Sequence, residues 1–379
     1  MKHNILIYTS IVLSLVSCID KSKLLIDNNY GTPVELNSIE VNVNIDDNTL
    51  NTYNVLSSLF YDGKDFIFAN NYRTHTIDIV NITDDNISHI ILDPEGPNGI
   101  SEEITGIYVS SLDSIWVATM TSISLIDSGG QIKKRYSLLK SDSETAMIMH
   151  NFSICTSKAY YNKIRNSLFH LVMSVSDNKS QFFVEELSLS DDSKKNYPIR
   201  FNNDKDLRND YGWKQFPNVT FTDSKILYNL PIESNIYVID IETGENNIYG
   251  GKSKFTENEV GKLILPYDFE QANRHICENI HFFEVNYDPI KNVYYRLHSG
   301  KIAFDATQDF ESILNKKELY LTVFNNKFEI INETKLETQK YNFRNCWGIT
   351  SQGFFMTRGN MYYKNANYEQ FQIDIFNIQ

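Results

Sequence analysis

Five cationic or protonatable side chains stand in short polar segments between apolar runs, where a ligand can reach them. They are Arg73, His75, Arg296, His298 and Arg358. Guanidinium groups that converge form bidentate hydrogen bonds to carboxylate or phosphate oxygens, and histidines add donors that titrate near neutral pH. These residues predict an anion-binding site if the fold gathers them. The alternative is that they are solvated loop residues paired with nearby acids such as Glu233 or Asp177.

A second candidate site is Arg208–Phe216, which places Tyr211 and Trp213 in a polar stretch. Exposed aromatic rings stack on sugar rings, clamp peptides or anchor protein interfaces. The segment therefore predicts a glycan-binding, peptide-binding or protein-binding surface. The alternative is that Trp213 packs between structural elements or closes the mouth of a channel.

The sequence patterns of common enzymes and metal sites are missing. The chain contains no Gly-x-Ser-x-Gly, His-Glu-x-x-His, EF-hand or Cys-x-x-Cys pattern. Acidic pairs such as Asp84-Asp85 fit turns better than calcium loops, because they lack the regular spacing of oxygen ligands. We therefore expect neither a cofactor nor a bound metal.

The composition bounds the class of protein. The 379 residues include 35 Lys and Arg against 48 Asp and Glu, a formal charge of −13. This charge argues against nucleic-acid binding, since phosphate affinity comes from clustered cations. Apolar residues make up 41% and charged residues 22%, which excludes disorder as the main state. Aromatic residues reach 13%, an enrichment that favours strands.

The first 17 residues predict a signal peptide. The apolar run Ile5–Val16 has twelve residues and spans roughly 18 Å as a helix, too short for a bilayer core of about 30 Å. The run ends in Leu15–Cys18, which resembles the lipobox of bacterial lipoproteins. That resemblance implies acylation of Cys18 as the first mature residue and contact with a membrane through the lipid. An ordinary signal peptide is the alternative.

Residues 18–34 are polar and predict a lipid-anchored tether. Ile19 is not Asp, so the inner-membrane retention signal of other lipoproteins is missing, and we expect an outer-membrane lipoprotein facing the periplasm or the exterior. With Cys18 acylated, three cysteines remain, and they form at most one disulfide: Cys155, Cys277 and Cys346.

The rest of the chain predicts an all-β fold with repeats. A hydrophobic-Asp-hydrophobic pattern recurs at Ile77–Ile79, Ile239–Ile241 and Ile373–Ile375. The first two copies lie 162 residues apart, or three units of 54. Only Asp268–His275 and Gln308–Lys316 read as helices.

Six units of about four strands fill residues 35–379, about 57 residues each, which is typical of a six-bladed β-propeller. The last unit lacks its outer strand, and a spare strand, Ser38–Asn44, precedes the first unit. We expect this N-terminal strand to complete the last blade and close the ring, because that removes two open sheet edges. Two stacked β-sandwich domains are the alternative.

In a propeller, the loops between second and third strands share one end of the channel with the loops between blades. We assign the segments that hold Arg73, Arg296 and Arg358 to that end, together with Glu233 and Arg208–Phe216. Loops freed from packing are the common place for binding residues. This placement predicts that Arg73, Arg296 and Arg358 lie around the same mouth of the channel.

Three features together resemble a known group: the Leu15–Cys18 lipobox, the loop Asp93–Ile100 and the strand Leu112–Trp116. In the loop, Pro97 fixes its own φ, and we expect positive φ at its glycines, Gly96 and Gly99. The chain resembles the six-bladed-propeller lipoproteins of unknown function from Bacteroides and its relatives. The resemblance implies an acylated, envelope-anchored protein and implies no catalytic residues.

Two functions remain open. The favoured hypothesis is a non-enzymatic binding propeller, anchored in the cell envelope, that holds a glycan, a peptide or a partner protein. The rival is a propeller enzyme acting on acidic glycans or lactones. Lactonase-type propellers use Glu, Asn and Asp around a channel metal, and the candidates here are Glu233, Asn229 and Asp177, with Arg296 and His298 as helpers.

Overall fold

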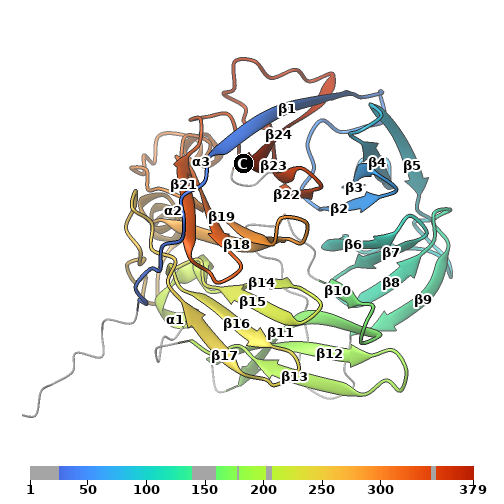
Figure 1. Cartoon of the computed structure of the whole chain (residues 1–379), viewed down its shortest axis with the longest axis horizontal. Coiled ribbons are helices and arrows are strands. Elements are labelled where there is room, and N and C mark those ends of the chain that lie inside the picture. The colour runs from blue at the N-terminus through green and yellow to red at the C-terminus, as the bar shows by residue number, and fades with distance from the viewer. Residues whose placement is uncertain (1–24, 139–158, 177–178, 202–206, 343–346) are drawn as a thin grey trace, which may run out of the picture.

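The computed structural model describes residues 25–138, 159–176, 179–201, 207–342 and 347–379. Six four-stranded antiparallel sheets surround a common centre, so the fold is the six-bladed β-propeller expected from the repeats (Figure 1). Blades 1 to 5 are formed by β2–β5, β6–β9, β10–β13, β14–β17 and β18–β21, and blade 6 by β22–β24 with β1. In the described part of the chain, no helix is both long and apolar enough to cross a bilayer.

The elements follow the blades in chain order. The strands are β1 Leu36–Asn44, β2 Leu56–Tyr61, β3 Lys64–Asn71, β4 Thr76–Asn81, β5 Asn86–Ile91, β6 Gly106–Ser111, β7 Ser114–Ala118, β8 Ser122–Ile126, β9 Ile132–Ser137, β10 Ala159–Asn162, β11 Ser167–Ser176, β12 Lys179–Ser188, β13 Lys194–Pro198, β14 Asn218–Phe221, β15 Lys225–Asn229, β16 Ile236–Asp240, β17 Asn246–Tyr249, β18 His281–Asp288, β19 Val293–Ser299, β20 Leu319–Asn325, β21 Ile330–Lys335, β22 Trp347–Thr350, β23 Gly353–Thr357 and β24 Gln370–Ile378. The helices are α1 Leu207–Asp210, the 3-10 turn η1 Gly212–Lys214, α2 Phe269–Glu278 and α3 Phe310–Leu314.

The ring closes through β1 and β24, which are far apart in the sequence. They pair antiparallel from Leu36 opposite Ile378 to Asn44 opposite Gln370, and Figure 1 shows β1 lying along β24. Val43 is 1% exposed and faces the fully buried Phe371. The expected closure by an N-terminal strand is therefore confirmed, and it leaves blade 6 without an open edge at β24.

A buried ionic cluster joins the two closing strands to the rest of blade 6. Asp374 of β24 lies opposite Glu40 of β1. The Asp374 carboxylate contacts Lys340 Nζ at 2.7 Å and Arg358 Nε at 2.8 Å. The same two cations reach Glu40 at 3.2 and 3.4 Å. Each charge thus has an opposite neighbour, which offsets the cost of removing Asp374 from water.

Two of the three Asp residues in the repeated hydrophobic-Asp-hydrophobic pattern are buried. Asp78 of β4 is fully buried and accepts hydrogen bonds from the Tyr53 hydroxyl at 2.7 Å and from Asn71 Nδ2 at 2.8 Å. Asp374 is buried in the ionic cluster described above. Asp240 instead accepts from the backbone N–H groups of a turn, Thr243 among them. The pattern marks third strands correctly, but its Asp plays different structural roles.

The two helices expected from the sequence are present with shifted ends. Asp268 precedes α2, where its carboxylate accepts from the Gln271 N–H at 2.7 Å and Gln271 Oε1 accepts from the Asp268 N–H at 2.9 Å. This reciprocal cap starts α2 at Phe269. Two short elements, α1 and η1, were not expected, and they form part of the segment that the sequence assigns to an aromatic loop.

Residues 25–34, which the sequence assigns to a tether, lie against blades 4 and 5. The Ile26 N–H donates to Asn235 Oδ1 at 3.0 Å, and Asn28 exchanges two hydrogen bonds with the backbone of Lys252 at 2.7 and 2.8 Å. Farther along, the Val34 N–H donates to the Ile331 carbonyl at 3.1 Å. The chain is therefore held by the propeller well before β1 begins.

The loop Asp93–Ile100 forms a tight turn in which the Gly99 N–H donates to the Gly96 carbonyl at 2.9 Å. Gly96 has φ 85°, as expected. The expected positive φ at Gly99 is wrong, because Gly99 is not among the positive-φ residues. Gly99 is needed for space instead: a Cβ there would lie 2.5 Å from the Glu95 carbonyl carbon.

The closing strand predicts a stability difference between two of its positions, one buried and one exposed. Val43→Ala removes two buried methyl groups beside Phe371 and is expected to lower the free energy of unfolding by about 1–3 kcal/mol. Ile39→Ala on the same strand, where the side chain is 41% exposed, should change it by about 0.5 kcal/mol or less. Urea unfolding followed by tryptophan fluorescence measures both. Equal losses would show that the burial of Val43 does not stabilise the closing strand.

Candidate functional site

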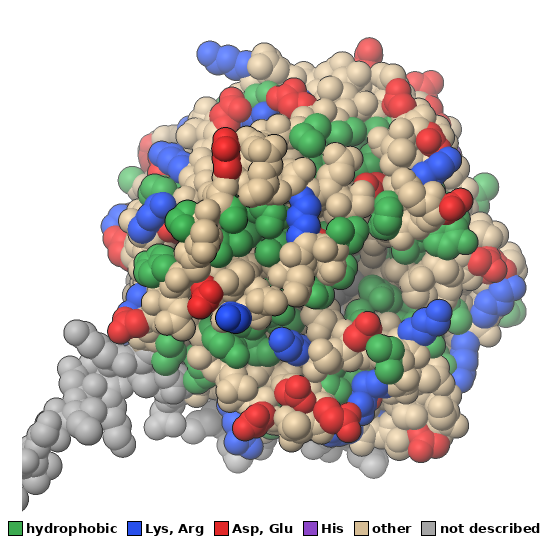
Figure 2. Space-filling model, in the orientation of Figure 1, with side chains coloured by type: hydrophobic (Ala, Val, Ile, Leu, Met, Phe, Trp, Pro, Cys, Tyr) green, Lys and Arg blue, Asp and Glu red, His purple; other side chains and the backbone are tan. Residues whose placement is uncertain are grey.

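A cavity with a volume of about 430 Å³ lies at the centre of the ring. All six blades contribute to its wall through the first strand of each blade or the turn that follows. Figure 2 shows a hollow near the middle of the visible face, with hydrophobic side chains at its edge. This volume is within the range of small-molecule sites.

One aromatic residue from each innermost strand lines this cavity, a set that we call the aromatic ring. Its members are Phe60 of β2, Tyr108 of β6, Tyr160 of β10, Phe221 of β14, Tyr287 of β18 and Trp347 of β22. Phe60 is 50% exposed, and the rings of blades 2 to 5 are partly exposed. Trp347 is fully buried, so it stiffens the wall, and its Nε1–H donates to Glu284 Oε1 at 2.8 Å.

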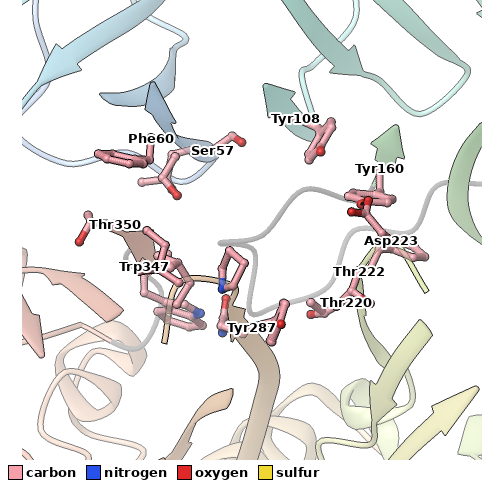
Figure 3. Close-up of a pocket in the computed structure, with 18 residues that line it drawn as sticks. Ser57, Phe60, Tyr108, Tyr160, Thr220, Thr222, Asp223, Tyr287, Trp347 and Thr350 are labelled. Carbon is pink, nitrogen blue, oxygen red and sulfur yellow. Dashed lines mark hydrogen bonds between the residues drawn. The ribbon is translucent and has the colours of Figure 1, made fainter. Parts of the chain in front are cut away.

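A cluster of three rings and one carboxylate forms one side of the cavity (Figure 3). The Tyr160 hydroxyl donates to Asp223 Oδ1 at 2.7 Å. The Tyr160 ring stacks on Phe221 with centroids 5.7 Å apart and meets the Tyr108 ring edge-on at 4.9 Å. Asp223 is exposed, and its carbonyl accepts from Asn162 Nδ2 at 2.9 Å. These contacts fix the cluster without closing it to ligand.

Burial keeps the tyrosines of this cluster protonated. It raises the pKa of Tyr108 to about 12, with the nearby Asp223 charge acting in the same direction. Burial also raises the pKa of Tyr160; repulsion from Tyr108, once that phenol ionises, and the hydrogen bond to Asp223 add to the shift. Both hydroxyls are therefore neutral hydrogen-bonding groups at physiological pH. Partly exposed Ser57, Ser58 and Thr222 add hydroxyls to the lining, whereas the Thr350 hydroxyl is buried and donates to the Gly353 carbonyl at 3.1 Å.

The cavity and the predicted arginine mouth lie at opposite ends of the blades. Asp223 and Ile290 follow the first strands of blades 4 and 5, and Thr350 is the last residue of the first strand of blade 6. Arg73 and Glu233 lie between second and third strands. Because consecutive strands are antiparallel, these two sets of turns lie at opposite ends of each blade.

The three arginines each have partners of their own. Arg73 is exposed and donates from Nη2 to the Asp47 carbonyl at 2.8 Å. Arg296 donates to the carbonyls of Ser234 and Gly251 and lies over the ring of Phe282 at 4.6 Å. Arg358 belongs to the buried ionic cluster with Asp374. The geometry brings none of these guanidinium groups to the central cavity.

The expectation that Arg296 and His298 lie in a loop is wrong, since both belong to β19 and both are fully buried. The His298 ring lies between Phe282 and Tyr320, with centroids 5.2 and 4.9 Å away. Burial holds the pKa of His298 well below its usual range, so the ring stays neutral. His75 lies in the turn after β3 with φ 57°. A ligand-binding role for these residues stays a prediction.

The other predicted residues pack into the fold. Tyr211 is 3% exposed between α1 and η1, and the Trp213 ring meets Phe269 of α2 edge-on at 5.2 Å. Glu233 is buried and accepts from the Tyr237 hydroxyl. Asn229 is fully buried in β15.

Several of the remaining predicted residues lie outside the part of the chain that the structure describes. Asp177 and the acylation candidate Cys18 lie outside them, as do Cys155 and Cys346. Cys277 is a buried free thiol. Within the described ranges, no group of three His, Cys, Asp or Glu side chains is placed to hold a metal ion.

Sequence reasoning missed the aromatic ring, although its signal was present. Each first strand carries an aromatic residue, but the spacing from blade to blade varies. Without the register of each strand, the sheet face on which a given side chain lies cannot be told from the sequence.

Two buried lysines, Lys214 and Lys317, were also missed. Lys214 Nζ donates to the Ile280 carbonyl at 2.8 Å, and Lys317 Nζ donates to the carbonyls of Ile276 and Asn279 at 2.9 and 2.8 Å. Both therefore satisfy carbonyls at the C-terminal end of α2. Burial lowers the pKa of Lys317 to about 7 and holds the pKa of Lys214 well below its usual range. No sequence signal marks them, because lysines are rarely buried.

The ring of six sheets with its central cavity defines the class of protein as a six-bladed β-propeller. The family model for DUF4221, a domain of unknown function, matches residues 33–335, and the chain belongs to this family. No match was found among the curated proteins.

Solved structures support the same fold. The crystal structure of a DUF4221 family member from Bacteroides vulgatus matches with a TM-score of 0.77 and 19% identity, over 92% of this chain and 99% of that chain. A protein from Bacteroides fragilis, described as exported, matches with a TM-score of 0.54 and 9% identity, over 93% of this chain and 98% of that one. At these identities the likeness shows the fold alone. The expected resemblance to propellers of unknown function from Bacteroides is confirmed.

The lysine pair predicts a specific pH dependence of stability. The pKa of Lys317 falls from 10.5 to about 7 on folding, so between these values the unfolded chain binds the extra proton. Raising the pH from about 7 to about 9.5 should therefore stabilise the folded state, by at most about 1.4 kcal/mol per pH unit for this group. Lys317→Met should flatten the rise in the free energy of unfolding measured by urea titration. Lys316→Met is the control, and an identical slope in wild type and Lys317→Met would contradict the assignment.

Proposed function

We propose that this DUF4221 propeller is a binding protein of the cell envelope whose central cavity holds a saccharide. The observation that carries the proposal is the aromatic ring: six inner strands each bring one aromatic residue to a single cavity of about 430 Å³. Sugar rings present apolar C–H faces and peripheral hydroxyls. Aromatic rings and neutral hydroxyls offer matching contacts for both.

The polar groups of the cavity favour hydrogen bonding over charge recognition of an anion. Ser57, Ser58 and Thr222 supply partly exposed hydroxyls, and the Tyr108 hydroxyl stays protonated because burial raises its pKa. The described lining residues include no Lys, Arg or His. This lining supports a neutral or cationic ligand and gives no support to an acidic glycan.

The envelope location is part of the proposal. The Leu15–Cys18 segment has the form of a lipobox, and the similar structure from Bacteroides fragilis belongs to a protein described as exported. Acylation of Cys18 would attach the propeller to a membrane through the docked residues 25–34.

Substitution at neighbouring residues of β2 tests the binding site. Phe60 lines the cavity, whereas Tyr61 does not, and the two side chains are 50% and 49% exposed. Glycan-array screening of the purified protein should identify bound saccharides, and Phe60→Ala should weaken their binding by about tenfold, since a stacked ring contributes about 1 kcal/mol beyond its buried area. Tyr61→Ala should leave binding unchanged. Saccharide binding that is insensitive to Phe60→Ala would place the site elsewhere.

The anchor has its own test. Metabolic labelling with an alkyne-modified palmitate should label the wild-type protein, because the acylated residue is expected to be Cys18. Cys18→Ser should abolish the label and move the protein to the soluble fraction, whereas Cys277→Ser, which alters a buried thiol, should keep it. Labelling that survives Cys18→Ser would exclude this anchor.

A further inference from the structure

The charge that the described lining residues bring to the central cavity is negative. Asp223 is the single carboxylate among its described lining residues, which include no Lys, Arg or His. The carboxylate is exposed, and the chain carries a formal charge of −13. A cleft lined by one sign of charge concentrates ions of the opposite sign. The cavity is therefore a more favourable place for a cation than for an anion.

The rings beside Asp223 add to this preference. Tyr160 is hydrogen-bonded to the carboxylate at 2.7 Å, and its ring stacks on Phe221 and meets the edge of Tyr108. Aromatic faces attract ammonium groups through the ring quadrupole, and the attraction grows as the cation loses water. Three rings and one carboxylate on one wall make a suitable site for an alkylammonium group. Figure 3 shows Tyr108, Tyr160 and Asp223 on the same side of the cavity.

We propose that the saccharide held by the central cavity carries a free, protonated amino group, which pairs with Asp223 and contacts the rings of Tyr108, Tyr160 and Phe221. This inference rests on the proposed function and names its ligand class: a hexosamine that is not N-acetylated. Phe60 and Tyr287, on blades 1 and 5, remain available for the apolar face of the sugar. The amine fixes the orientation of the saccharide in the cavity, and the hydroxyl groups of the wall contact the rest of it.

A matched pair of disaccharides tests the amine. The β-1,4-linked glucosamine dimer and its di-N-acetylated form differ only in the charge and acetylation of nitrogen. Calorimetry at about pH 6, below the titration range of an amine, should show at least tenfold tighter binding of the free amine. Added salt should weaken that binding, because the pair with Asp223 is solvent-accessible.

Two charge-matched variants locate the effect. Asp223→Asn keeps the shape and should reduce the preference for the free amine to about twofold or less. Asp62→Asn removes a carboxylate from the corresponding turn of blade 1, outside the cavity lining, where φ 50° suits Asn. This variant should keep the full preference. Thermal unfolding of both variants verifies that they are folded.

The outcomes separate the inference from the proposed function. Equal or tighter binding of the acetylated dimer overturns the amine and leaves saccharide binding in place. A preference that survives Asp223→Asn also overturns the inference, since the carboxylate would not be its source. Binding of neither dimer overturns it as well, and an array without any bound saccharide would in addition remove the proposed function.

Discussion

The antiparallel pairing of β1 with β24 is the constraint on which the rest of the molecule depends. A propeller cavity exists only while all six blades stay in a ring, and this pairing is the one place where the two ends of the described chain are joined in a sheet. Its inward face is apolar at Val43 and Phe371, and an ionic cluster around Asp374 and Glu40 flanks it. Loss of the pairing would expose two strand edges and release blade 6, which supplies Trp347 and Thr350 to the cavity wall.

The closed ring also explains why one cavity combines residues so distant in sequence. Each blade delivers its innermost strand to the axis, so Phe60 and Trp347 line the same space although they lie near opposite ends of the chain. Packing between blades includes aromatic contacts, such as that of Phe283 with Trp347 at 5.1 Å. Such rigid walls hold the Tyr160–Asp223 pair in position without any help from a ligand.

The architecture was predictable because its signals are local or periodic. The strand repeats, the missing outer strand of the last unit and the spare strand before the first unit together predict the propeller and its closure. The burial of Arg296 was not predictable in the same way. Middle strands of a blade are covered on both faces by neighbouring blades, so in β19 residues of either parity are buried, including Arg296 and His298. Alternation of polar and apolar residues, the usual guide to an exposed face, is lost in such strands.

The candidate site was missed for a related reason. Arginines and histidines draw attention because they carry charge, whereas the structure places ordinary Tyr and Phe side chains around the axis. Which face of a short inner strand points to the axis depends on register, which no single blade reveals. The prediction for Arg208–Phe216 illustrates the opposite case: its aromatic residues suggested a ligand surface, and the structure uses Trp213 against α2.

Because residues 25–34 are docked on the propeller, only the segment before them can act as a linker to a membrane. Seven residues separate Cys18 from Ile26, the first residue with a described hydrogen bond to the propeller. Fully extended, that stretch reaches at most about 30 Å. With a lipid on Cys18, the propeller would sample only a thin layer beside the bilayer. It would therefore meet ligands that are themselves concentrated at the envelope surface far more often than those diffusing in bulk solution.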